Sequence, residues 1–181
     1  MKKEDMSWKT LSSKYLIKRP WLTARCDRVE LPTGQINEEY YVLEYPDWVN
    51  IIALTPDNRF VFVRQYRYGL GKTVDEICAG VCEKGEDPLA AARRELLEET
   101  GFGGGQWRKL MELSANASTC NNLTHCFVAT GVEQVASQHL DRTEDIRVEL
   151  FDRDEVLGML RRGEIWQSLM AAPLWRYFAE G

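Results

Sequence analysis

Residues 89–100 constrain this chain more than any other segment. They follow Asp87-Pro88 and are followed by Gly101. Aspartate is a preferred residue before a helix, proline is favoured in the first turn, and glycine readily adopts the left-handed conformation that ends helices. The residues between these signals are mostly strong helix formers. The sequence therefore predicts a well-delimited helix from Leu89 to Thr100.

Three glutamates, Glu95, Glu98 and Glu99, fall within an arc of about 100° on one side of this predicted helix. Like charges spaced three or four residues apart repel by a few tenths of a kcal/mol per pair, and the C-terminal half of a helix disfavours anions. Arg94 can pair with Glu98 but cannot neutralise all three. The carboxylates therefore form either a solvated acidic face or a site for a hard cation such as Mg²⁺ or Mn²⁺.

The residues around the helix favour the second alternative. The segment from Gly80 to Phe102, GVCEKGEDPLAAARRELLEETGF, fills all nine specified positions of the signature of the Nudix hydrolases. The chain therefore resembles the Nudix family, and the order of expected strands and helices from Trp48 onward is similar. The resemblance implies an α/β (α+β) fold in which a mixed β-sheet is sandwiched between helices.

The rest of the chain predicts one domain with an N-terminal appendage. Its 181 residues suit one ordinary domain rather than two. We expect residues 1–45 to form an appendage of antiparallel strands and residues 46–181 to form the Nudix domain. In the appendage, apolar runs predict strands at residues 15–17, 21–29 and 39–44, with a turn at Pro32-Thr33-Gly34.

Strands and two further helices are expected in residues 46–181. The clearest pair is a hairpin of residues 48–54 and 59–65 around the turn Thr55-Pro56-Asp57-Asn58. The other expected strands are residues 74–78, 108–113, 123–130 and 146–152, and the helices are residues 154–161 and 165–178.

The family resemblance implies metal-dependent hydrolysis of a nucleoside diphosphate derivative, with water attacking a phosphorus of the pyrophosphate bridge. By match of position, Glu95, Glu99 and Glu98 are metal ligands, and the Ala79 carbonyl is a further contact. Mg²⁺ is the expected cofactor, with Mn²⁺ as a possible substitute.

Other residues of the signature have supporting roles by the same match. Glu98 is also a candidate general base, and Arg94 would orient the glutamates. Glu86 is expected to be an outer partner of the site. Gly80 and Gly101 would permit backbone conformations that other residues disfavour.

Segments outside the signature resemble the ADP-ribose and nucleoside diphosphate sugar pyrophosphatase branch. They are VRQYRYG, VDEICAG and TEDIRVELF. This resemblance implies ADP-ribose or another nucleotide sugar as the substrate, giving a nucleoside monophosphate and a sugar phosphate. It implies a catalytic role for Glu144, whose alternative is a solvated loop acid. Arg67, Arg64 and Glu76 are candidates for substrate binding, with Arg67 favoured because alternation along a strand turns only one of the arginines inward.

One position departs from the branch. Its members usually carry a proline about sixteen residues after the signature glycine, where this chain has Ala117. Two other functions therefore stay open: a house-cleaning hydrolase of nucleoside triphosphates or dinucleoside polyphosphates, and a sensor that binds a nucleotide sugar without hydrolysing it.

Partners and location are expected from composition and from the branch. The formal charge of −5 offers no basic surface for nucleic acid. No apolar run is long enough to span a membrane, and the N-terminal residues lack a secretory signal, so we expect a cytoplasmic protein whose five cysteines are reduced thiols. The branch tends to dimerise through its N-terminal strands, so a homodimer is expected, with a candidate surface at Tyr40, Tyr41, Val42, Leu43 and Tyr45.

Overall fold

The computed structural model describes residues 5–180, which form two compact units. The N-terminal unit contains the residues up to Tyr45 together with the loop Ser114–Asn122. The main unit contains Pro46–Leu113 and the residues from Leu123 onward. No helix among the described residues is long and apolar enough to cross a membrane.

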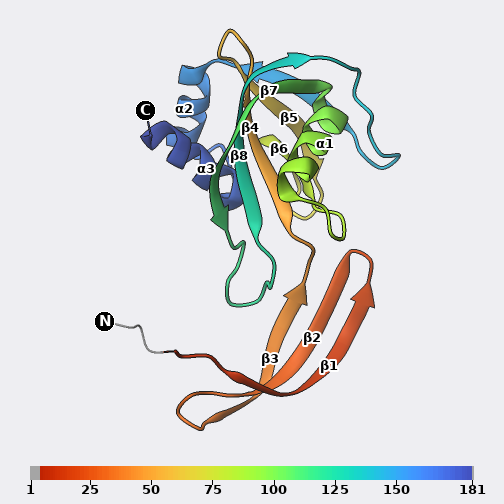
Figure 1. The fold of residues 1–181 in the computed structure, drawn as a ribbon, viewed down its shortest axis with the longest axis vertical. Coiled ribbons are helices and arrows are strands. Elements are labelled where there is room, and N and C mark those ends of the chain that lie inside the picture. Colours follow the sequence, from red (N-terminus) through yellow and green to blue (C-terminus); the bar gives the residue numbers. More distant parts are fainter. Residues whose placement is uncertain (1–4, 181) are drawn as a thin grey trace. The chain divides into compact units, whose positions relative to one another are not determined.

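The N-terminal unit is a three-stranded antiparallel sheet of β1 (Lys9–Arg19), β2 (Leu22–Glu30) and β3 (Ile36–Glu44), in that order (Figure 1). The strands expected from the apolar runs are thus confirmed; β1 and β3 are longer than expected, and β2 has the expected nine residues, shifted by one. The loop that connects two strands of the main unit bonds to β3: Leu43 N donates to Thr119 O at 2.7 Å, and the Tyr40 hydroxyl donates to Ser118 O at 2.6 Å.

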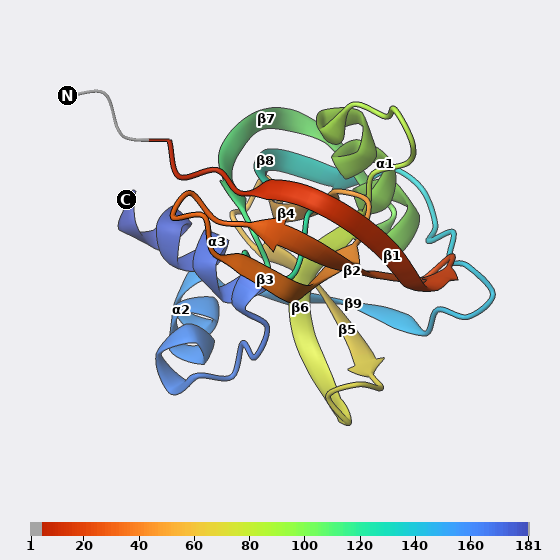
Figure 2. The same cartoon turned by 90° about the horizontal axis from the view of Figure 1, so that it is seen from below.

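The main unit has a six-stranded mixed sheet with the order β7-β8-β4-β6-β5-β9. The β4–β8 pair is parallel and its other neighbouring pairs are antiparallel. One helix covers one face, and two helices cover the other (Figures 1 and 2). The fold class expected from the sequence is confirmed. The strands are β4 (Trp48–Leu54), β5 (Phe60–Arg67), β6 (Lys72–Val81), β7 (Phe102–Leu113), β8 (Thr124–Gln134) and β9 (Ile146–Phe151), and the helices are α1 (Pro88–Thr100), α2 (Arg153–Arg162) and α3 (Ser168–Ala179).

The expected hairpin of β4 and β5 exists only at its turn. Two residue pairs join the strands there, Ala53 with Val61 and Leu54 with Phe60. Beyond the turn the two strands diverge and β6 lies between them. The first part of β6 pairs with β5, and its last four residues pair with β4. This double pairing explains why β6 has ten residues where the local pattern predicts a strand of only five.

The start of β7 was not predicted. The strand begins at Phe102, directly after the helix, and pairs with β8 through a glycine-rich segment. Gly105 shows why glycine is needed there: its φ is +70°, and a Cβ would meet the carbonyl oxygen of Thr130. Glycines weaken the apolar alternation by which strands are recognised, so the pattern becomes visible only from Arg108.

A buried hydrogen bond compensates for the proline inside α3. Pro173 has no N–H, so the carbonyl of Leu169, four residues earlier, lacks its usual helical donor. Asn50 of β4 is buried, and its Nδ2 donates to Leu169 O at 2.6 Å. The side chain of a sheet residue thus replaces the missing helical bond and attaches α3 to the sheet.

We predict that Asn50→Leu lowers the free energy of unfolding by about 1–3 kcal/mol, because it leaves the buried Leu169 carbonyl without a donor. Adding Pro173→Ala restores a backbone N–H that can bond the same carbonyl, so the double variant should lose less stability than Asn50→Leu alone. Urea unfolding of the four proteins of this cycle measures the difference. Additive effects of the two substitutions would contradict the compensation.

Candidate active site

Helix α1 is capped as the sequence predicts. The side chain of Asp87 accepts bonds from Leu89 N and Ala90 N at 3.0 and 3.1 Å. Gly101 has φ +74°, and its N–H donates to Leu97 O. Between these caps, the buried residues Ala91, Ala92 and Leu96 lie in a core with residues of β4, β5, β6 and β8. This packing turns the neighbouring glutamates toward the sheet.

The three glutamates of α1 do not form a uniformly solvated face. Glu99 is 6% exposed, and the side chain of Glu95 is 15% exposed, whereas that of Glu98 is 40% exposed. Glu95 and Glu99 face two residues of β6 that lie on either side of Gly80. Val81 N donates to Glu95 Oε1 at 3.2 Å, and Ala79 N donates to Glu99 Oε2 at 3.3 Å. A solvated acidic face, one of the two alternatives that the sequence leaves open, is therefore wrong for Glu95 and Glu99.

Gly80 allows this close approach. It lies within β6, without a positive φ, so the unusual conformation expected for it is not found. Glycine is required for space instead, because a Cβ at this position would overlap the carboxylate of Glu95. The role expected for Gly101 is confirmed by its left-handed conformation.

Arg94 bonds three carboxylates at once. Its guanidinium contacts Glu95 Oε1 at 2.9 Å and Glu98 Oε2 at 3.0 Å, and two of its nitrogens contact both oxygens of Glu86 at 3.0 Å. Nη2 also donates to the carbonyl of Val81 at 2.9 Å. These partners raise the pKa of Arg94, and its guanidinium lowers the pKa of Glu86. Arg94 therefore holds the carboxylates of Glu95 and Glu98 in place, and Glu86 holds the guanidinium of Arg94 from the other side.

Glu99 has no cationic partner among residues 5–180. The pKa of Glu99 is raised to about 7; burial is the largest cause and the charges of Glu95 and Glu144 act in the same direction, while hydrogen bonds from Cys78 and Ala79 oppose the shift. Burial likewise raises the pKa of Glu95. An ionised carboxylate in such surroundings is costly unless a positive charge compensates for it.

The donor set suits a divalent cation. Carboxylate oxygens are the preferred ligands of Mg²⁺ and Mn²⁺, and Glu99 is a buried carboxylate that a cation would stabilise. In the described part of the chain, no three potential ligands already surround one point. Arg94 instead engages Glu95 and Glu98. Ala79 of β6 contacts Glu99 of α1 through its backbone N–H, whereas the expectation from the sequence concerns its carbonyl.

Strand alternation separates the two candidate arginines. Val63 and Glu76 are paired across β5 and β6, on the face that α1 covers, as the positions of Val61 and Cys78 in its core show. Arg67 shares this parity and donates to Glu76 Oε2 from Nε at 3.0 Å and from Nη2 at 2.7 Å. Because Glu76 is buried, its carboxylate orients the half-exposed Arg67.

Arg64 belongs to the other face of the sheet. It bonds both oxygens of Asp75, at 2.8 and 3.0 Å, and lies 3.4 Å from Glu149. The structure therefore brings Arg67 and Glu76 to the face that carries the glutamates but does not bring Arg64 there. This is the separation that alternation along the strand predicts.

Glu144 lies in the exposed loop between β8 and β9. Its Oε2 accepts from Asp141 N at 2.8 Å, and its N–H donates to Asp141 O at 2.9 Å. Its charge reaches the buried Glu99 carboxyl. Sequence reasoning missed two neighbours of this region. Cys78 bonds Glu99 from beneath the helix, and Gln138 donates to the Glu99 carbonyl at 2.6 Å. Neither residue belongs to a pattern that would reveal the contact.

Comparisons with known proteins identify the family. A family model described as "NUDIX domain" matches residues 44–172, and one described as "Nucleoside diphosphate sugar hydrolase N-terminal domain" matches residues 8–43. The chain belongs to the Nudix hydrolase family. A solved structure titled "Crystal structure of ADP compounds hydrolase" shares this Nudix fold, with a TM-score of 0.84 over 98% of this chain and 96% of that one at 20% identity.

Relatives of known sequence extend over most of this Nudix hydrolase. The chain is 34% identical to a methanol dehydrogenase activator of Bacillus methanolicus, over 88% of this chain and 86% of that protein. It is 27% identical to an ADP-ribose pyrophosphatase of Bacillus subtilis, over 93% and 91% of the two chains. An ADP-ribose pyrophosphatase of Mycobacterium tuberculosis is 29% identical, over 93% of this chain and 82% of that one.

We predict that metal-free protein loses stability as the pH rises, in part because of Glu99. Its pKa is 4.5 ordinarily and about 7 when folded, so the folded state holds the proton more tightly, and this advantage disappears between these pH values. The free energy of unfolding of Glu99→Gln minus that of the parent should therefore rise by about 3 kcal/mol from pH 4.5 to pH 8.

The measurement is urea unfolding of both proteins in EDTA at several pH values. Subtracting one free energy of unfolding from the other at each pH cancels the contributions of groups that titrate in both proteins. A difference that stays constant over this range would show that Glu99 ionises normally in the folded protein.

Proposed function

We propose that this Nudix hydrolase cleaves the pyrophosphate of ADP-ribose or another nucleoside diphosphate sugar, releasing a nucleoside monophosphate and a sugar phosphate. The observation that carries the proposal is the arrangement of Glu95, Glu98 and Glu99 along one side of α1, with two of them held against the backbone of β6. Anionic side chains in this number can approach a pyrophosphate only with cations between them.

The residues that would hold Mg²⁺ or Mn²⁺ are Glu95, Glu98 and Glu99, with the Ala79 carbonyl as a further ligand. Such an ion, when bound, neutralises phosphate charge and makes water more acidic. Arg94 keeps two of these carboxylates in place through its hydrogen bonds at 2.9 and 3.0 Å. Glu99 would release its proton when such an ion binds, because the positive charge would compensate for the burial of its carboxylate.

Other side chains bind substrate and activate water in this proposal. The guanidinium of Arg67, held by the buried Glu76, contacts the substrate phosphates, since a planar fork of donors suits them. Glu144 accepts the proton of the attacking water, with Glu98 as the other candidate for this base. A carboxylate has two oxygens, so Glu144 can take the proton on Oε1 while Oε2 keeps its bond with Asp141 N.

The substrate class rests on the relatives. Two of them are named ADP-ribose pyrophosphatase and match most of this chain. GDP-mannose pyrophosphatases match a smaller share, such as that of Citrobacter koseri, 34% identical over 58% of this chain. The match of residues 8–43 to a nucleoside diphosphate sugar hydrolase domain favours this class over house-cleaning hydrolases. Ala117 leaves the choice among sugars open.

The experiment that tests the proposal is phosphate release coupled to alkaline phosphatase, with Mg²⁺ and then Mn²⁺. The panel is ADP-ribose, ADP-glucose, GDP-mannose, UDP-glucose, NADH, diadenosine polyphosphates and nucleoside triphosphates. We expect the highest kcat/KM with ADP-ribose or another nucleotide sugar. Preference for triphosphates or dinucleoside polyphosphates would favour the house-cleaning function, and binding of ADP-ribose without turnover would favour the sensor.

In the same assay, Glu98→Gln, Glu99→Gln and Glu144→Gln should each lower kcat by about 100-fold or more, as expected for groups that act on the reacting atoms. Glu133→Gln, an exposed residue near the end of β8, is the matched control and should retain activity. Turnover within a few-fold of the parent in all three variants would rule out the assigned mechanism.

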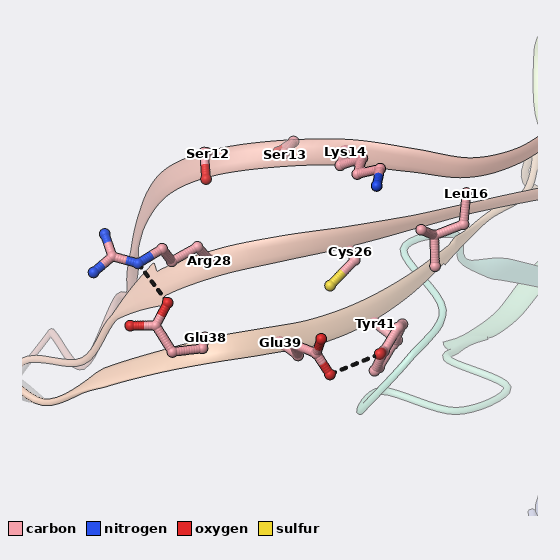
Figure 3. Close-up of a pocket in the computed structure, with 9 residues that line it drawn as sticks. All are labelled: Ser12, Ser13, Lys14, Leu16, Cys26, Arg28, Glu38, Glu39 and Tyr41. Atoms are coloured by element: carbon pink, nitrogen blue, oxygen red, sulfur yellow. Dashed lines mark hydrogen bonds and ion pairs between the residues drawn. The ribbon is translucent and has the colours of Figure 1, made fainter.

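We also propose that the protein is a homodimer that uses the N-terminal unit. Of the surface expected from the sequence, only Tyr41 is clearly exposed, because Val42 is buried and Tyr40 and Leu43 bond the loop 114–122. Exposed apolar side chains lie on β1 and β2 instead. They include Tyr15, Leu16, Ile17 and Leu22. A hollow of about 310 Å³ lies on this sheet. Figure 3 shows that Leu16 and Tyr41 line it together with polar and charged side chains such as Lys14, Arg28 and Glu38.

The dimer is tested by light scattering after size exclusion. We expect twice the chain mass for the parent and a single chain for Leu16→Glu with Ile17→Glu, because charges in an apolar interface are costly. Lys84→Gln with Arg161→Gln lowers the net charge by the same two units at exposed positions of the main unit and is the control. A monomeric parent at micromolar concentration would refute the proposal.

A further inference from the structure

The loop between β8 and β9 (residues 135–145) lies beside α1 (Figures 1 and 2). The last carbonyls of a helix have no partner inside the helix, and here the backbone N–H groups of this loop bond to them. Three backbone bonds join its first residues to the end of α1: Val135 N and Ala136 N donate to Gly101 O, and His139 N donates to Glu98 O, at 2.9, 3.1 and 2.8 Å. The loop is thus attached to the turn that carries Glu98 and Glu99.

One side chain extends this attachment. Nε2 of Gln138 donates to the carbonyl of Glu99 at 2.6 Å and to the carbonyl of Ile146 at 3.2 Å. An amide nitrogen has two hydrogens, so a single group can satisfy both acceptors. Ile146 is the first residue of β9. The two ends of the segment 139–145 are therefore joined through Gln138.

Glu144 lies inside that closed segment. Its backbone and carboxylate bond Asp141, so the segment has its own internal turn. Because the base of the segment is fixed to the Glu99 carbonyl, the path of the segment decides where the Glu144 carboxylate lies relative to the side chain of Glu99. The charge of Glu144 is close enough to act on that side chain.

We propose that Gln138 is a positioning residue for hydrolysis: it fixes the segment that carries Glu144 against the end of α1 that carries Glu98 and Glu99. This inference rests on the proposed function, in which Glu144 accepts a proton from water. Reacting groups lose about 100-fold in rate when they are displaced by about 1 Å, so a side chain that closes this loop affects turnover without touching the substrate.

The test compares Gln138→Met, which keeps the length but has no donor, with the parent. The control is Gln134→Met, at an exposed position near the end of β8. We expect Gln138→Met to lower kcat by about 10-fold or more with KM within about 3-fold. Gln138→Lys should recover part of kcat, because an ammonium group can donate to both carbonyls. Gln134→Met should match the parent.

Two further readouts do not depend on turnover. Amide hydrogen exchange in residues 140–145 should be about 10-fold faster in Gln138→Met, because opening this segment becomes easier. Mn²⁺ affinity, followed by electron paramagnetic resonance, should stay within about 2-fold, because the variant leaves the carboxylates of α1 in place. Unchanged exchange would overturn the proposal, whichever substrate the enzyme uses. A large loss of Mn²⁺ affinity would also overturn it, because Gln138 would then support α1 itself.

A double-mutant cycle with Glu144→Gln separates this inference from the proposed function. If Gln138 acts through Glu144, Gln138→Met should have little further effect on kcat in the Glu144→Gln background. Independent, multiplying effects would overturn the positioning role. Full activity of Gln138→Met beside an impaired Glu144→Gln would overturn the inference and leave the proposed function standing. Full activity of Glu144→Gln would overturn the inference and make Glu98 the base, with the proposed hydrolysis itself unchanged.

Discussion

The main unit depends on the close contact between α1 and β6. Two carboxylates one helical turn apart, those of Glu95 and Glu99, face three consecutive residues of this strand, and Gly80 provides the space in the middle. The end of β6 that faces the helix, residues 78–81, pairs with β4, and the beginning of the strand pairs with β5. The divergence of the β4–β5 hairpin is therefore part of how the site is built.

The same contact imposes an electrostatic cost. Arg94 bonds Glu86, Glu95 and Glu98, but within residues 5–180 no cation pairs with Glu99. A core designed only for stability would replace a buried acid by an apolar side chain. The retained acid raises the free energy of the folded protein near neutral pH. Arg94 limits this cost by neutralising the neighbours of Glu99, and the cation of the proposed function would compensate for Glu99 itself.

How well the sequence predicts each part depends on how local its cause is. The caps of α1 at Asp87 and Gly101 are set by adjacent residues, so the helix is predicted almost to the residue. The same holds for the acidic signature that it carries. The length of β6 depends on two partner strands, and the bond of Asn50 to Leu169 spans more than a hundred residues. Gln138 bonds backbone carbonyls, which every residue has, so nothing in the sequence distinguishes its partners. Burial of Glu99 was missed because a helical wheel shows a face but not what covers it.

The departure at Ala117 can be understood from the loop in which it lies. The loop 114–122 connects β7 with β8, yet its hydrogen bonds run to β3 in the N-terminal unit. Its turn is formed by Asn116, whose side chain accepts from Ser118 N at 3.2 Å and whose carbonyl accepts from Thr119 N and Cys120 N at 3.0 and 2.8 Å. Asparagine forms such turns through its own side chain, whereas proline forms them by restricting φ. The loop therefore keeps a defined turn without the proline of the branch. Because none of these bonds involves α1 or β6, residue 117 can vary while the glutamates keep their geometry.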